Sequence, residues 1–155
     1  MELLDHIKRP NFWERSFHGG TYVGNALTMR AGYTLITELE KNAEKFYPYM
    51  ERLGNRFREG LEEIFSKYNF EAYVTGVGSM IGIHFTKEKP VDGLTSERTK
   101  NIEMCNKFFR HMLNNKIVYV SAQKPHLFIS VAHTEEEIDK FVTLTEEFVK
   151  REKEK

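Results

Sequence analysis

Cysteine is almost missing from this sequence, which has one, Cys105, among 155 residues. A single cysteine excludes a disulfide within the chain and fits a protein of a reducing compartment. Because Cys105 falls on the apolar side of a helical pattern, we interpret it as a small core residue. The six histidines also lack the paired spacing of metal ligands, so we expect no metal site.

Neither sign of charge is in excess, since Lys+Arg and Asp+Glu both number 23. This balance argues against a broad cationic face for nucleic acid or anionic lipid. No run approaches the roughly 18 apolar residues of a membrane span, and the start Met1-Glu2-Leu3-Leu4-Asp5 lacks the basic region of a signal peptide. We therefore expect a soluble, cytoplasmic protein without nucleic-acid or membrane partners.

A glycine-rich stretch is the most informative feature that is present. Gly19, Gly20 and Thr21 directly precede a helix that we expect to begin near Asn25. Backbone amides of such glycines, the threonine hydroxyl and the positive end of the helix dipole could together hold a phosphate. A simple turn followed by a capped helix explains the same residues equally well. The stretch is not a P-loop, because no Gly-Lys-Ser/Thr follows.

Two long helices are predicted after this stretch. Leu27, Ala31, Leu35 and Leu39 recur every four residues, and a second apolar face runs from Ala43 to Tyr68. Pro48 lies inside the second pattern and predicts a kink or a restart there.

The period then changes from helical to alternating, which predicts two strands, around 70–74 and 81–85. The intervening Gly76-Val77-Gly78-Ser79 indicates a hairpin turn, with a second phosphate cradle as the alternative. Residues 87–98 show no periodicity and are predicted to be a loop, either a lid or simply mobile. A helix over 102–113, strands at 117–120 and 127–131, and a helix capped by Thr134 follow, with a fraying tail at 151–155.

This order of elements predicts an α+β fold, in which a small, mostly antiparallel sheet carries helices on one face and is preceded by long helices. One domain core is expected for this length.

Several of these segments resemble the class III pyridoxal-phosphate aminotransferases. The most specific are Gly20-Thr21-x-x-Gly24-Asn25, followed by an alanine-containing helix, and Ala132-His133-Thr134-Glu135-Glu136. The resemblance implies the C-terminal part of the aspartate-aminotransferase-like fold. Residues 1–40 would be the end of the large domain, with the arm and interdomain helix, and 41–155 would be the small domain. Ser121 to His126 departs from the family's loop, which leaves the substrate open.

The resemblance also implies a role for Gly20 and Thr21, which would bind the phosphate of pyridoxal 5'-phosphate held by the other subunit of a dimer. The family's cofactor lysine and its carboxylate partner precede this segment, whereas here only Lys8 precedes Thr21, in an unrelated context. We therefore expect no catalytic residue in this chain and no activity of the chain alone.

The resulting hypothesis is a fragment or split half of such an enzyme, which acts on a small amino-acid-like substrate. Its partner would be a second copy or a lysine-bearing N-terminal half. The alternative is a free-standing α+β interaction module that kept the fold without the chemistry.

Overall fold

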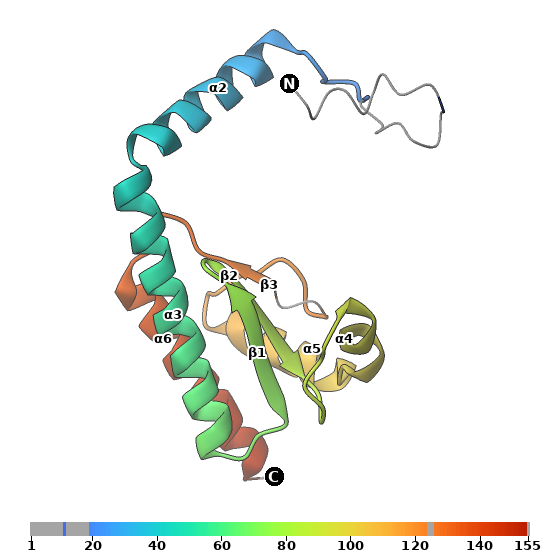
Figure 1. The fold of residues 1–155 in the computed structure, drawn as a ribbon. Helices are drawn as coiled ribbons and strands as arrows, with labels where there is room; N and C mark the ends of the chain where they lie inside the picture. Colours follow the sequence, from blue (N-terminus) through green and yellow to red (C-terminus); the bar gives the residue numbers. More distant parts are fainter. Residues whose placement is uncertain (1–10, 12–18, 124–125, 155) are drawn as a thin grey trace. The chain divides into compact units, whose positions relative to one another are not determined.

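The computed structural model describes residue 11 and residues 19–123 and 126–154 (Figure 1). The chain divides into two structural units, Met1–Ala43 and Glu44–Lys155. Helix α2 (Ala26–Lys41) belongs to the first unit. The second contains nearly all of α3 (Ala43–Lys67), a three-stranded sheet and three further helices. The aromatic arm residues Phe12, Trp13 and Phe17 lie outside the described residues.

Helix α2 starts where the sequence predicts. Asn25 caps it, because its side-chain Oδ1 accepts a hydrogen bond from the Thr28 amide at 3.1 Å. None of the residues of α2 is buried. The helix ends at Asn42, and α3 begins at the next residue.

Helix α3 follows the predicted apolar face, and every buried residue on it lies between Leu53 and Phe65. Pro48 is the sixth residue of this helix, beyond its first turn, so its missing amide removes one hydrogen bond within the helix. Helix α3 nevertheless continues through Pro48, so the predicted restart there is wrong, and the boundary between α2 and α3 lies at Asn42.

The sheet is antiparallel with the strand order β1-β2-β3. Strands β1 (Ala72–Val77) and β2 (Met80–Phe85) form a hairpin around Gly78-Ser79, and β3 (His126–Phe128) pairs with the other edge of β2. Alternation along the strands places one set of side chains on the core face: Ala72, Val74, Ile81, Ile83, Phe85 and Leu127.

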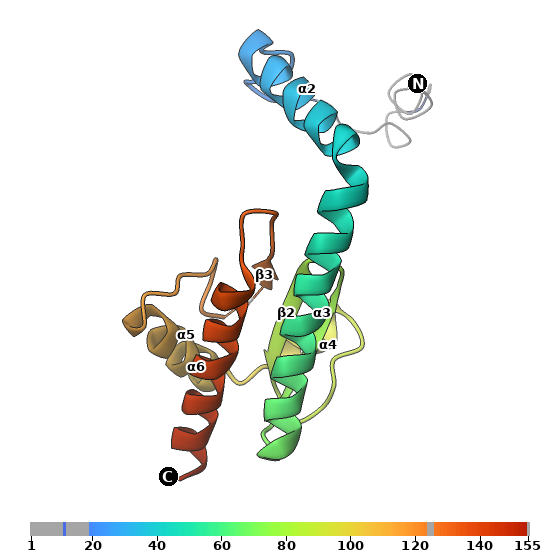
Figure 2. The ribbon, with the colours of Figure 1, turned by 90° about the vertical axis from the view of Figure 1, so that its left-hand side faces the viewer.

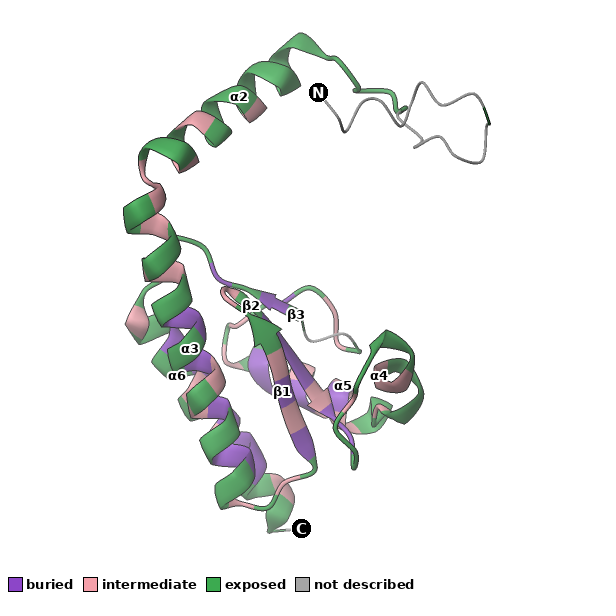
Figure 3. Ribbon diagram, in the orientation of Figure 1, coloured by how far each residue is buried: buried purple, intermediate pink, exposed green. Residues whose placement is uncertain are grey.

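Three helices supply the other half of this core, namely α3, α5 (Ile102–Asn114) and α6 (Glu135–Lys153). Figure 2 shows α3 and α6 running beside each other, and Figure 3 shows the buried stretches of helices and strands. Aromatic rings fill the centre, where Phe108 lies 5.1 Å from Phe85 and 5.2 Å from Phe148 between ring centroids. The predicted α+β arrangement is confirmed.

Charged pairs join α3 to α6 along their solvent side. Arg56 makes two hydrogen bonds of 2.7 Å to the Asp139 carboxylate, and Arg52 pairs with Glu135 one turn away. Because these side chains are largely exposed, they fix the alignment of the helices more than they add stability.

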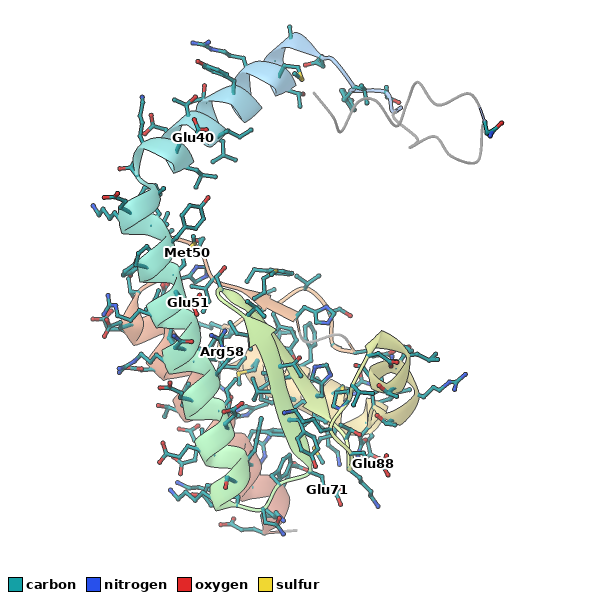
Figure 4. All side chains as sticks on the ribbon, viewed as in Figure 1. Glu40, Met50, Glu51, Arg58, Glu71 and Glu88 are labelled. Atoms are coloured by element: carbon teal, nitrogen blue, oxygen red, sulfur yellow. The ribbon has the colours of Figure 1, made fainter. Side chains whose placement is uncertain are left out.

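The β1–β2 turn packs directly on α3. Gly54 is buried there, and a Cβ at this position would lie 2.0 Å from the Gly78 carbonyl oxygen. Arg58, labelled with Glu51 in Figure 4, donates a hydrogen bond of 2.5 Å to the same oxygen. The helix therefore needs a glycine at position 54.

Four further details of the predicted elements are wrong. The predicted loop at 87–98 contains a short helix, α4 (Gly93–Thr99), because Asp92 and Thr95 form a reciprocal capping box. Residues 117–120 do not pair as a strand, and β3 is shorter than predicted. The tail does not fray at Arg151, since α6 continues to Lys153 with basic residues in its last turn that favour the helix dipole.

Candidate functional site

The predicted site residues Gly20 and Thr21 lie in two overlapping turns that lead into α2 (Figure 1). The Val23 amide donates to the Gly20 carbonyl and the Asn25 amide to the Tyr22 carbonyl, both at 3.1 Å. Gly24 has φ +74° at the third position of the second turn, a conformation that strongly favours glycine. The glycines of the motif therefore fix the direction in which the chain enters the helix.

This turn keeps hydrogen-bond donors available for an anion. Gly20 and Thr21 are exposed, and the Thr21 hydroxyl has no hydrogen bond with the described residues. The first turn of α2 contains no acidic residue, so no carboxylate of its own competes for the positive end of the helix dipole. The arrangement fits a phosphate group at Thr21, while Asn25 also provides the ordinary helix cap.

Among the described residues of the first unit, no lysine that could carry an aldehyde cofactor lies beside this turn. Within the described part of the first unit the only lysine is Lys41, which pairs with Glu38 at 3.2 Å. Lys41 ends the helix that Thr21 precedes, roughly 24 Å away along the axis at 1.5 Å per residue.

Helix α2 and the turn before it expose large apolar side chains. Leu27 is 80% exposed, and six others are at least half exposed: Tyr22, Val23, Met29, Tyr33, Leu35 and Ile36. A concentration of this kind on one short element is typical of an interaction surface.

The second glycine motif, Gly76-Val77-Gly78-Ser79, is a hairpin turn. The Gly78 carbonyl accepts the Arg58 hydrogen bond, and the Ser79 carbonyl accepts one from the Ile129 amide at 2.9 Å. These contacts tie the turn to α3 and to the residue after β3, so the structure favours the hairpin over a phosphate cradle.

Three of the described histidines form hydrogen bonds within the fold: His84, His111 and His133. His111 is buried and bonds to the Leu144 carbonyl at 2.8 Å, and His84 lies between Thr75 and Ser96 at 2.8 and 3.0 Å. Burial lowers the pKa of His84, and His126 adds to this effect. No group of three or more metal-ligating side chains occurs among the described residues. Within the same residues, no helix is long and apolar enough to cross a membrane.

Sequence reasoning missed one surface, a groove beside β3. It is lined by residues 116–120, by 126–129 and by the first turns of α6. Its signal in the sequence was the alternating apolar pattern of Ile117 to Val120, which predicted a paired strand.

Comparison with known proteins gives one family. The model of the class-III aminotransferases matches residues 2–145. A glutamate-1-semialdehyde 2,1-aminomutase from Clostridium botulinum is 35% identical over 88% of this chain, and the match covers 32% of that relative. The chain thus spans about a third of the length of the curated relatives it matches.

Solved structures show the same fold. A β-phenylalanine aminotransferase from Variovorax paradoxus superposes with a TM-score of 0.70 at 26% identity, over 86% of this chain and 30% of that one. A glutamate-1-semialdehyde aminomutase from Pseudomonas aeruginosa superposes with a TM-score of 0.73 at 20% identity, over 90% and 30%.

Proposed function

Because the chain belongs to the class III aminotransferase family, we propose that it is the C-terminal third of an enzyme resembling glutamate-1-semialdehyde 2,1-aminomutase. The match to named aminomutases over most of the chain carries this proposal. Residues 1–40 then form the end of the large domain with the interdomain helix, and 41–155 form the small domain. The single cysteine supports a cytoplasmic location.

Pyridoxal 5'-phosphate is the cofactor of this family. When bound, it supplies an electron sink for moving or exchanging an amino group on a small amino-acid-like substrate. The role of this chain is to bind and orient the cofactor. Gly20 and Thr21 would hold its phosphate through a backbone amide and a hydroxyl. The lysine and the carboxylate that the chemistry requires come from the remainder of the enzyme.

The exposed apolar side chains of α2 support a second part of the proposal, a two-fold dimer in which Leu27 and Leu35 are covered. Each Thr21 would then reach the cofactor of the neighbouring subunit. Light scattering at micromolar concentration tests this: we expect a dimer for the chain and a monomer for the variant Leu27→Glu/Leu35→Glu. A monomeric parent chain would remove the dimer from the proposal.

Cofactor affinity tests the phosphate site directly. The chain is combined with the lysine-bearing part of the Clostridium botulinum relative, and pyridoxal phosphate binding is followed by fluorescence. Loss of a hydrogen bond to a charged group costs about 1.5–3 kcal/mol, so Thr21→Ala should raise Kd roughly 10- to 100-fold. Thr34→Ala is the matched control, because the Thr34 hydroxyl bonds to the Arg30 carbonyl of its own helix. Equal Kd values for the two variants would show that Thr21 does not bind the phosphate and is only a turn residue.

Borohydride reduction of the chain alone with pyridoxal phosphate tests the missing lysine. We expect weak labelling spread over several lysines in a peptide map. Stoichiometric labelling of one lysine would show that the chain carries its own cofactor lysine. The alternative, an interaction module without cofactor chemistry, is favoured if neither half binds the other.

A further inference from the structure

Residues 117–120 have the side-chain pattern of a strand without its pairing. Tyr119 is buried and Ile117 half-buried, whereas Val118 and Val120 are 75% and 79% exposed. The Ile117 amide bonds to the Met112 carbonyl, but the backbone groups of 118–120 have no hydrogen bond with the described residues. An extended segment with one apolar side facing out and its backbone unpaired is a template for another strand.

Strand β3 also has one edge that pairs with none of the described residues. The Ile129 amide donates to the Ser79 carbonyl. Leu127, two residues earlier, therefore also points its amide and carbonyl towards β2. His126 and Phe128 occupy the alternate positions, and their amides and carbonyls point away from β2. Phe128 adds an exposed aromatic ring on this edge.

These two edges border one groove, which we call the β3 groove. The volume of this groove is about 500 Å³. Its lining consists of residues 116–120 and 126–129, Phe57, His133 and the α6 residues 137, 138, 140 and 141. Its apolar wall includes Leu127, Ile138 and Phe141, which belong to the core. A groove of this volume has room for several amino-acid residues, which is enough for a short extended segment.

The charges on the rim are unequal. Lys116 and Lys140 are exposed, and neither has an ion pair with the described residues. The carboxylate of Glu137 is held by the Thr134 amide at 2.9 Å as part of the α6 capping box. The two lysines outnumber this one carboxylate, so the groove carries a net positive charge and favours an acidic partner.

We propose that the β3 groove binds an extended, apolar segment with acidic flanking residues, which pairs its backbone with the free edges along the groove by β-strand addition. The segment comes from the two thirds of the enzyme that this chain does not span, because its relatives are about three times as long. The inference rests on the proposed function, and it names a surface through which the two parts hold together.

The test uses the chain with the lysine-bearing part of the Clostridium botulinum relative as the probe. Amide hydrogen exchange is measured for the free chain and the mixture, and Kd for the two parts is measured by calorimetry. In the complex we expect exchange at 126 and 128, and at alternate positions within 118–120, to slow by at least about tenfold, as newly formed strand hydrogen bonds require.

Two variants and their matched controls probe the side chains. Lys140→Glu reverses a rim charge, and Lys153→Glu makes the same change at the far end of α6. Val118→Glu places a charge on the outward side of the segment, and Val91→Glu does so at an equally exposed valine elsewhere. We expect Kd to rise at least tenfold for each groove variant and less than twofold for each control.

The outcomes are distinguishable. A complex whose groove amides exchange as fast as in the free chain overturns the inference and leaves the proposed function standing. Absence of any complex overturns both. Protection of the same amides in the chain alone, rising with its concentration, assigns the groove to a second copy and also overturns the inference.

Discussion

Replacing Gly54 with alanine is the sharpest test of how the β1–β2 turn sits on α3. Alanine normally stabilises a helix by about 1 kcal/mol relative to glycine. Here its Cβ would lie 2.0 Å from the Gly78 carbonyl oxygen, so the turn must move by more than 1 Å to reach an ordinary contact distance. That movement also breaks the 2.5 Å hydrogen bond from Arg58, whose side chain is only 15% exposed.

The expected loss follows from these terms. Overpacking costs about 1–3 kcal/mol and a hydrogen bond to a charged group about 1.5–3 kcal/mol, against about 1 kcal/mol gained from helix propensity. The net loss is about 1.5–5 kcal/mol, or a fall in Tm of at least about 6 °C at roughly 4 °C per kcal/mol.

Thermal unfolding followed by circular dichroism measures this loss, with Gly60→Ala as the control on the same helix. At Gly60 the new Cβ would meet only the Val142 side chain, at 3.0 Å, which can move aside. We expect a much smaller change for the control. A Gly54→Ala protein at least as stable as the parent would refute the assignment of Gly54 as a close-approach glycine.

Three further predictions concern single side chains. Lys67 and Tyr68 hold the pKa of Glu146 at about 2, so the free energy of unfolding should fall as the pH drops from about 4.5 towards 2, and Glu146→Gln should flatten that part of the curve measured by urea denaturation. Because burial lowers the pKa of His84, the unfolded chain binds a proton at a higher pH than the folded chain does. The free energy of unfolding should therefore fall as the pH decreases through about 6.5. A His84→Phe variant whose free energy of unfolding falls with pH as steeply as that of the parent would contradict this. The buried Tyr119 hydroxyl has no hydrogen-bond partner among the described residues, so Tyr119→Phe should leave Tm unchanged or raise it, and a fall of several degrees would show that the hydroxyl is bonded.

The elements that depend on local chemistry are the ones the sequence predicts well. The Thr134–Glu137 capping box starts α6 where expected, and the Asn25 cap starts α2. The apolar face of α3 gives its buried residues directly. In each case the residues that determine the helix start or its buried face lie within the helix or next to it.

Pairing between distant segments could not be read in the same way. The alternation of Ile117 to Val120 is real, since burial alternates along it, yet a strand also requires a partner whose position is set by the whole fold. Helix α4 was missed for the opposite reason, because it buries none of its residues and so leaves no apolar period. At the candidate site, the sequence located the Gly20–Thr21 turn, and the structure added the exposed Thr21 hydroxyl and the first turn of α2, which contains no acidic residue.

The position of α6 has a consequence for how the second unit folds. Its Phe141 and Phe148 complete the aromatic centre, and its charged partners Arg52 and Arg56 lie 83 residues earlier in the chain. Contacts with so large a sequence separation form late, because a long loop must close before they are made. During synthesis the apolar faces of the hairpin and α5 would stay exposed until α6 is made, so this interval is the one in which the chain most needs protection from aggregation.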